Sequence, residues 1–249
     1  MARLPLPRVT LALAVGAACG LAAVAGAGGN LVVNGTFESG LVGFSSDYVH
    51  TPQGNVDEGT WWVHPPDPGG PWFGTQHTPG GAAAMSVNGD DSSQAGQKRV
   101  WYQTVAVKPG KTYRFSTWAL ATAAGFSGYS LRFAFDGVVV GGTIVPTQAF
   151  TWEEFTTTIV PSGRTVEISI KNVSGITFPN DFMLDDISLE LVVAASDLNG
   201  DGTVDAADLG ILLGAWGTCG ACGNCPADLD GDCAVGPSDL GILLGDWTG

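Results

Sequence analysis

A twelve-residue acidic pattern occurs twice near the end of this 249-residue chain, and it constrains the local fold more than any other feature. The copies begin at Asp197 and Asp228, 31 residues apart, and read DLNGDGTVDAAD and DLDGDCAVGPSD. Each continues into LGILLG, one further residue and a tryptophan. Residues 197–249 hold nine Asp but no Glu, Lys or Arg. Because repetition marks a unit built from equivalent halves, we expect these residues to form a separate module.

The first copy places side-chain oxygens at regular positions. Loop positions one, three, five, nine and twelve are occupied by Asp197, Asn199, Asp201, Asp205 and Asp208. Gly202 at position six permits a sharp turn, and Thr203 at position seven offers its carbonyl. A twelve-residue loop of this kind supplies the six to eight oxygens that Ca²⁺ takes. We therefore predict a calcium site here, with a solvated acidic turn as the alternative.

The second copy keeps most of the same ligand positions. Asp228, Asp230, Asp232 and Asp239 stand at positions one, three, five and twelve, and Ala234 offers the position-seven carbonyl. Cys233 replaces the glycine at position six, and Gly236 has no side chain for position nine. Water can fill position nine in such loops. We expect weaker calcium binding here, with a metal-free remnant as the alternative.

Two acidic loops that end in Asp, each followed by LGILLG and a tryptophan, resemble a type I dockerin module over residues 197–249. Residues 191–196 are too few for the entering helix of an ordinary EF-hand. The resemblance implies a small α-helical adaptor that folds on Ca²⁺ and docks onto a cohesin-like protein domain. Its recognition positions, ten and eleven, fall on Ala206-Ala207 and Pro237-Ser238, which differ from each other and from the family's common Ser/Thr type.

Four of the five cysteines lie in this module, and they are Cys219, Cys222, Cys225 and Cys233. An even number of cysteines in a small exported unit predicts disulfides. A four-thiolate zinc site is the alternative. Four cysteines allow three pairings, and the sequence leaves the connectivity open.

The first 27 residues have the pattern of a secretory signal peptide. Arg3 and Arg8 precede an apolar run that ends in small residues typical of a cleavage site. The run is mostly Ala and Gly, so a membrane anchor is the weaker interpretation. No later run is apolar enough to span a bilayer. We expect a secreted, extracellular or cell-surface protein with no membrane span in the mature chain.

The net charge of −14 argues against nucleic acid as a partner. Neutralising phosphates requires clustered Lys and Arg, and the eight basic residues beyond the first ten positions are scattered.

Residues 28–193 show the period-two pattern of β-strands. Val166, Ile168 and Ile170 alternate with polar residues, and Pro109-Gly110 and Asp136-Gly137 supply turns between such runs. We therefore predict a mainly β fold, an antiparallel sandwich, in this part of the chain.

Several stretches of this region resemble bacterial jelly-roll domains of the galactose-binding-like class, which include many carbohydrate-binding modules. They include NLVVNGTFE at 30–38, QTVAVKPGKTYRFS at 103–116 and NDFMLDDIS at 180–188. The resemblance implies that the first and last strands share a structural Ca²⁺, held by Glu38 and by Asp185 or Asp186. Ordinary surface carboxylates are the alternative.

Residues 50–81 form an unusual segment with six Pro, seven Gly and all three His of the chain. Sugar rings bind to exposed aromatic platforms flanked by polar side chains. We predict a polysaccharide or surface-glycan site made of Asp47, Tyr48, Trp61, Trp62 and Trp72. The alternative is that these aromatics pin a long loop onto the sandwich.

Catalysis has little support in the sequence. Adjacent carboxylates such as Glu153-Glu154 point to opposite faces of a strand, and no nucleophile elbow or zinc-protease motif occurs. We expect a non-catalytic binding protein. A polysaccharide-degrading glycoside hydrolase and an adhesive surface protein without sugar specificity remain the alternatives.

Overall fold

The computed structural model describes residues 29–51, 57–64, 76–90, 96–122, 129–174, 180–221 and 223–249. These residues belong to two compact units. One comprises residues 30–109 and 114–189, and the described part of the other comprises residues 29, 110–113 and 190–249. The predicted signal segment, residues 1–27, lies outside the described residues.

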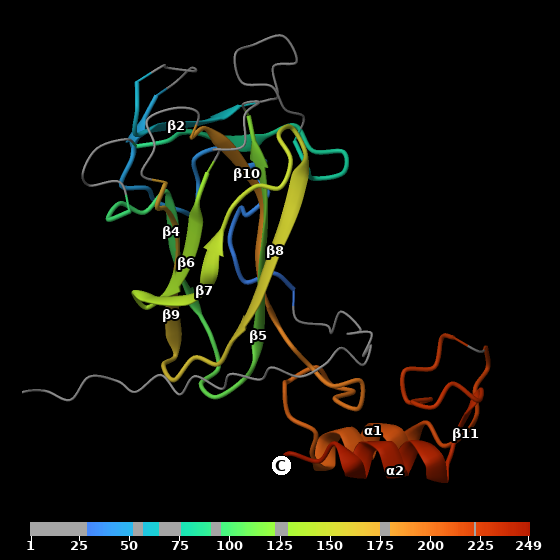
Figure 1. Ribbon diagram of the computed structural model, residues 1–249. Coiled ribbons are helices and arrows are strands. Elements are labelled where there is room, and N and C mark those ends of the chain that lie inside the picture. The colour runs from blue at the N-terminus through green and yellow to red at the C-terminus, as the bar shows by residue number, and fades with distance from the viewer. Residues whose placement is uncertain are drawn as a thin grey trace, which may run out of the picture. The chain divides into compact units, whose positions relative to one another are not determined.

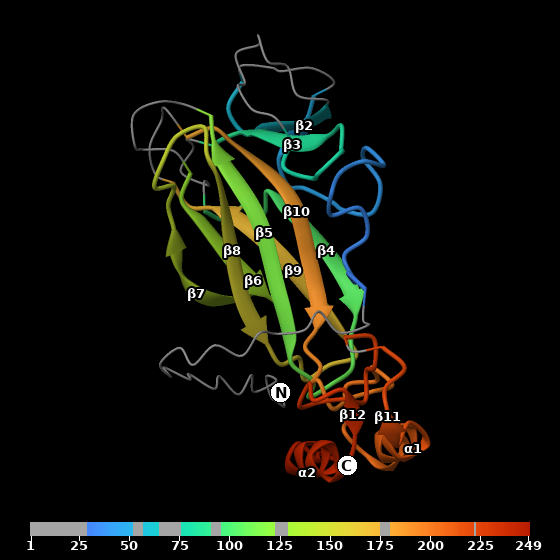
Figure 2. The same cartoon turned by 90° about the vertical axis from the view of Figure 1, so that its right-hand side faces the viewer.

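The first unit is a β-sandwich of two sheets, which Figure 1 shows as separate layers. The six-stranded sheet has the order β1-β2-β3-β10-β5-β8, and Figure 2 shows β10, β5 and β8 side by side. Its strands are β1 Val49–His50, β2 Thr60–His64, β3 Ala84–Asn88, β10 Phe182–Leu191, β5 Tyr113–Ala121 and β8 Trp152–Ile159. The four-stranded sheet has the order β4-β9-β6-β7, with β4 Trp101–Ala106, β9 Thr165–Asn172, β6 Leu131–Phe135 and β7 Val138–Ile144. The predicted mainly β sandwich is confirmed, although β1 pairs with β2 in parallel.

The strand pattern follows from alternating side chains. In β4, Trp101, Gln103 and Val105 are buried, whereas the residues between them are exposed or half-buried. The inner faces meet in an aromatic core in which the ring of Phe115 contacts those of Phe133 (5.2 Å) and Phe135 (5.5 Å). Burial of these rings is the main contribution that holds the two sheets together.

The start of the sandwich lies along its last strand. The amide of Leu31 donates to the carbonyl of Leu189 (2.9 Å), and the amide of Ile187 donates to the carbonyl of Gly35 (2.9 Å). A Cβ on Gly35 would stand 1.9 Å from the Ile187 carbonyl oxygen, so only glycine permits this approach. The N-terminal segment and β10 are therefore fixed side by side.

The second unit contains two short helices and one small ladder. Helix α1 spans Ala206–Gly214 and α2 spans Pro237–Gly245, while β11 (Gly217–Thr218) pairs with β12 (Ala234–Val235). Leu212 of α1 and Leu243 of α2 are fully buried in one apolar cluster with Val204, Ala227 and Val235. Among the described residues, no helix has the length and apolar character needed to cross a membrane.

Candidate functional site

The first acidic loop folds around its own carboxylates. The two oxygens of Asp197 accept the amides of Asp201 (3.1 Å) and Gly202 (2.6 Å). The carboxylate of Asp208, which is fully buried, accepts the amides of Asn199 (3.0 Å) and Asp205 (2.9 Å). The carboxylates at positions one and twelve therefore hold the loop backbone in place through hydrogen bonds from its amides.

The second loop repeats this hydrogen-bond frame. Asp228 accepts the amides of Asp232 (3.1 Å) and Cys233 (3.0 Å), which are again loop positions five and six. Asp239 accepts the amides of Asp230 (3.1 Å) and Gly236 (2.7 Å), which are positions three and nine. The changes at positions six and nine have therefore left the loop geometry intact.

The ligand oxygens of the second loop lie close enough together to share one cation. One carboxylate oxygen each from Asp228, Asp230 and Asp232 lies within 4.8 Å of the others. Among the described residues, this is the one group of three or more His, Cys, Asp or Glu side chains that meets this condition. Carboxylates and carbonyls are hard oxygen donors, so the donor set fits Ca²⁺.

The helices that follow help to hold the position-twelve carboxylates. Asp205 caps α1, and its side chain accepts the amide of Ala207 (2.8 Å), while Pro237 occupies the first turn of α2. Burial opposes ionisation of Asp239, but the amides of Gly236, Asp230 and Leu229 outweigh it and lower the pKa of the carboxyl. Asp239 is thus an anion at neutral pH, as a metal ligand must be.

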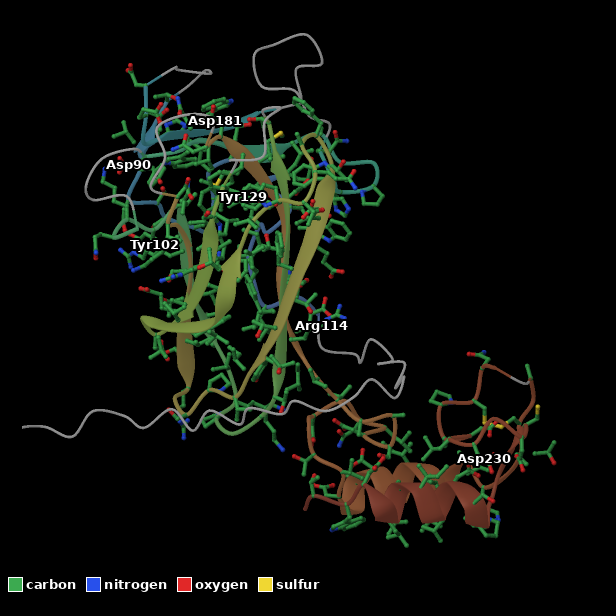
Figure 3. All side chains as sticks on the ribbon, viewed as in Figure 1. Asp90, Tyr102, Arg114, Tyr129, Asp181 and Asp230 are labelled. Carbon is green, nitrogen blue, oxygen red and sulfur yellow. A yellow bond between two sulfur atoms is a disulfide. The ribbon has the colours of Figure 1, made fainter. Side chains whose placement is uncertain are left out.

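The cysteines cross-link the segment between the two loops. Cys219 and Cys225 form a disulfide, which Figure 3 shows in yellow, and Cys233 is also disulfide-bonded. Cys222 lies outside the described residues. A disulfide-bonded cysteine has no thiolate to bind zinc, so these three cysteines support the disulfide prediction over the zinc alternative.

Large apolar side chains are exposed at the same places of both helical repeats. They are Ile211, Leu213 and Trp216 in the first repeat and Ile242, Leu244 and Trp247 in the second. The residues at loop positions ten and eleven, Ala206-Ala207 and Pro237-Ser238, are also exposed. The module therefore presents two similar apolar surfaces.

The aromatic residues predicted to form a sugar platform are mostly buried. Trp61 and Trp62 are 7% and 2% exposed, and Tyr48 is 5% exposed. The ring of Trp61 packs against those of Phe44 and His50, with centroids 5.4 and 4.9 Å apart. Its Nε1 donates to the carbonyl oxygen of Tyr48 (3.1 Å). Assigning Tyr48, Trp61 and Trp62 to an exposed platform is therefore wrong, because their faces pack on protein. Trp72 lies outside the described residues.

Asp47, by contrast, belongs to a surface cluster. The Arg99 guanidinium donates to both oxygens of Asp47 (2.9 and 3.0 Å) and to Glu167 (3.1 Å). It also lies 3.5 Å from the ring centroid of Tyr102. The hydrogen bond from Arg99 lowers the pKa of Asp47. We call these four residues the Arg99 cluster.

The Arg99 cluster stands on the outer face of the four-stranded sheet. Tyr102 is on β4, where it is half-buried, and Glu167 is on β9. Figure 3 shows Tyr102 beside β4, far from Arg114 on β5 of the other sheet. The alternation of β4 places Tyr102 outward, but sequence reasoning missed its pairing with Arg99.

Glu38 and the carboxylates of β10 accept backbone amides of one loop. Glu38 accepts the amides of Ala82 (2.8 Å) and Ala83 (3.0 Å). Asp185 accepts the amides of His77 (2.8 Å) and Thr78 (3.1 Å). In the part of the chain that the structure describes, Glu38, Asp185 and Asp186 belong to no three-ligand group. The predicted calcium at Glu38 and Asp186 gains no support from this arrangement.

A second aromatic cluster surrounds the same loop. His77 Nδ1 is hydrogen-bonded to Asp186 Oδ2 (2.5 Å), and the imidazole stacks on the Trp118 ring (3.8 Å between centroids). Trp152 contacts His77 edge-on at 5.7 Å. Burial raises the pKa of the neighbouring Asp185 to about 6, against the amides that favour its charged form. Sequence reasoning did not predict the contacts of His77 with Trp118 and Asp186.

No family model and no curated protein matches the sequence. Similar solved structures include the sugar-binding C-terminal domain of EclA, at 14% identity over 37% of this chain with a TM-score of 0.35. The xylan-binding CBM22-1 domain of Paenibacillus barcinonensis Xyn10C is 16% identical over 69% of this chain, with a TM-score of 0.45. TmCBM61, solved with β-1,4-galactotriose, is 15% identical over 65% of this chain, with a TM-score of 0.42. The chain spans 66% of the EclA domain, 99% of the xylan-binding domain and 98% of TmCBM61.

Proposed function

We propose that this protein is a calcium-dependent adaptor whose C-terminal unit binds Ca²⁺ in a dockerin-like manner and tethers the sandwich to a partner. The observation that carries the proposal is the group formed by Asp228, Asp230 and Asp232, whose carboxylate oxygens lie within 4.8 Å of one another. It stands in a loop whose hydrogen-bond frame repeats that of residues 197–208. Two similar frames with oxygen donors at positions one, three, five, seven and twelve favour two calcium sites.

The ligands follow from the loop positions. In the first loop they are Asp197, Asn199, Asp201, Asp205, Asp208 and the Thr203 carbonyl, and in the second they are Asp228, Asp230, Asp232, Asp239 and the Ala234 carbonyl. When bound, Ca²⁺ supplies positive charge to a segment with nine Asp and no basic residue. Without it, these carboxylates repel one another around a small apolar core. We therefore propose that calcium binding and folding of the unit are coupled.

The docking partner that we propose is a cohesin-like protein domain. Leu213 and Leu244 are both 52% exposed, and Trp216 and Trp247 are 47% and 38% exposed. Exposed apolar groups at equivalent places of both repeats are typical of a surface that a protein partner covers. Calcium ions at the loops would fix the helices that carry these side chains.

Calorimetric titration of the EDTA-treated full chain with Ca²⁺ tests this proposal. We expect two equivalents bound with micromolar or tighter affinity, together with a gain of helical circular dichroism. Asp230→Asn should remove one equivalent, whereas Asp246→Asn, which makes the same charge change outside the loops, should retain both. If the wild-type protein binds no calcium in this range, the proposal fails.

The second function that we propose is glycan binding by the sandwich, and the Arg99 cluster favours it. A guanidinium stacked on an aromatic ring and fixed between Asp47 and Glu167 offers donors and acceptors for sugar hydroxyls. The cluster stands on an accessible sheet face. A glycan array of the intact protein tests the idea. We expect Arg99→Ala to lose the binding profile and Arg114→Ala, on the other sheet, to keep it.

We further propose that the protein is exported and non-catalytic. The N-terminal signal pattern supports export, and the lack of catalytic motifs in the sequence supports a binding role. Incubation of the intact protein with the polysaccharides that bind on the array tests for catalysis. Release of reducing sugar would favour the hydrolase alternative.

A further inference from the structure

The two acidic loops differ in one backbone feature that bears on the metal. Gly202 and Cys233 stand at the same loop position, and both have a left-handed backbone, with φ of 87° and 73°. Both amides donate to the position-one carboxylate, at 2.6 Å to Asp197 and 3.0 Å to Asp228. The turn at position six therefore aims an amide that holds the first calcium ligand in place.

Only one of these residues adopts this conformation without cost. Glycine has no Cβ and enters the left-handed region freely, whereas other residues are strained there. Gly202 needs no external restraint. Cys233 needs such a restraint, because other interactions have to offset the unfavourable free energy of its left-handed conformation.

The restraints on Cys233 come from the cross-linked segment. Cys233 is disulfide-bonded, and its carbonyl accepts the amide of Cys219 (3.0 Å). The next residue, Ala234, pairs with Thr218 across the β11–β12 ladder. The Cys219–Cys225 disulfide is a separate bond that does not include Cys233. The first loop is also paired to a neighbouring segment, because the carbonyl of Val204 accepts the amide of Thr248 (3.0 Å), but it contains no cysteine and therefore no disulfide.

We propose that Cys233 is a positioning residue of the second calcium loop and that it acts through its disulfide. The oxidised cysteine holds the position-six turn and keeps its amide on Asp228. The affinity of the second loop for Ca²⁺ therefore depends on the redox state of Cys233, and that of the first loop does not. The inference rests on the proposed calcium binding and adds a condition to it.

The redox step is the ordinary reduction of a disulfide. The sulfur–sulfur bond breaks, two electrons and two protons enter, and two thiols form. A dithiol reductant supplies both and is itself oxidised to a cyclic disulfide. No calcium ligand changes chemically, and only the restraint on the turn is lost. By linkage, bound Ca²⁺ must protect the Cys233 disulfide by the same factor.

Calcium titrations of the EDTA-treated full chain, oxidised and reduced with dithiothreitol, test the inference. Asp197→Asn isolates the second loop, and Asp228→Asn isolates the first. We expect reduction to lower the calcium affinity of the second loop by about tenfold and to change the calcium affinity of the first loop by less than about twofold. Equal affinity of the second loop in both redox states would overturn the inference.

Two variants show whether Cys233 itself is responsible. With the reductant present, Cys233→Gly should retain tight binding in the second loop, because glycine adopts the turn freely. The double variant Cys219→Ser/Cys225→Ser, without reductant, should also retain it, since it removes only the other disulfide. Loss of the second site in either variant would contradict the role of Cys233.

A thiol measurement gives a readout that does not depend on calorimetry. Alkylation and mass spectrometry at a fixed dithiol-to-disulfide ratio should show Cys233 about tenfold more resistant to reduction with Ca²⁺ than with EDTA. Unchanged resistance overturns the coupling. If the oxidised protein binds no calcium at all, the proposed function fails together with this inference. If it binds two equivalents regardless of redox state, only this inference fails.

Discussion

Asp208 and Asp239 make the same contacts at the starts of their two helices. Oδ1 of each accepts the amide of loop position three, at 3.0 Å from Asn199 and 3.1 Å from Asp230. Oδ2 of each accepts the amide of position nine, at 2.9 Å from Asp205 and 2.7 Å from Gly236. Both carboxylate side chains are buried, so these amides replace water as their hydrogen-bond donors.

Asp239→Ala should therefore destabilise the C-terminal unit even when calcium is saturating. The amides of Leu229, Asp230 and Gly236 lose their shared acceptor, which costs about 1–3 kcal/mol. Urea unfolding followed by the helical circular dichroism signal measures the free energy. Asp246→Asn is the control, because Asp246 is exposed and outside the loops, and asparagine keeps an oxygen acceptor for the Ser196 hydroxyl. Equal stability of the two variants would show that the amides find other partners.

Leu243 and Leu244 are neighbours in α2, but we expect Leu243 to stabilise the fold and Leu244 to contact a partner. Leu243 is fully buried in the helical core, and Leu244 is 52% exposed. Leu243→Ala should cost about 2–5 kcal/mol of unfolding free energy, and Leu244→Ala should change it by less than about 0.5 kcal/mol. Thermal or urea unfolding of both variants with Ca²⁺ makes the comparison. A large cost for Leu244→Ala would mean that this side chain is covered in solution.

Trp61 should matter for the stability of the sandwich and not for its ligands. Its ring is 7% exposed and packs against Phe44 and His50. Trp61→Ala should lower the unfolding free energy by about 3–5 kcal/mol and leave the glycan profile of the folded protein unchanged. Trp216→Ala, which removes an exposed indole of the other unit, is the control for stability. A selective loss of glycan binding by the folded Trp61 variant would restore the platform interpretation.

The local patterns were predictable, and the distant contacts were not. Alternation identified Val166, Ile168 and Ile170 as the inner face of β9, and each is buried. It failed for Trp61 and Trp62, which point to opposite faces of β2 yet are both buried. A strand covered on both faces leaves no such signal in its own sequence.

The Arg99 cluster escaped prediction for a similar reason. It forms because the segment around Ser45 bridges to Tyr102 and brings Asp47 beside Arg99. The hydrophobic periodicity of a sequence does not show which segments more than fifty residues apart will pair. The acidic loops are the opposite case, since their ligands and their turn lie within twelve consecutive residues.

Asp185 should make the stability of the sandwich depend on pH. Burial raises its pKa from 3.8 to about 6, although the amides of Thr78, Asp186 and His77 favour the charged form. Because the folded pKa lies above the unfolded value, the contribution of Asp185 to stability is fully present below about pH 4. It is lost as the pH rises through about 6.

We expect the unfolding free energy of the sandwich to increase by about 1–3 kcal/mol when the pH is lowered from 7.5 to 4.5. Asp185→Asn, which removes the titrating group and keeps one acceptor oxygen for the amides of His77 and Thr78, should flatten this dependence. Glu154→Gln, an exposed change on β8, should preserve it. Urea unfolding across this pH range, followed by the β-sheet circular dichroism signal, makes the measurement. Asparagine at position 185 does not titrate. If the stability of the Asp185→Asn variant still depends on pH to the same extent, the dependence comes from another group.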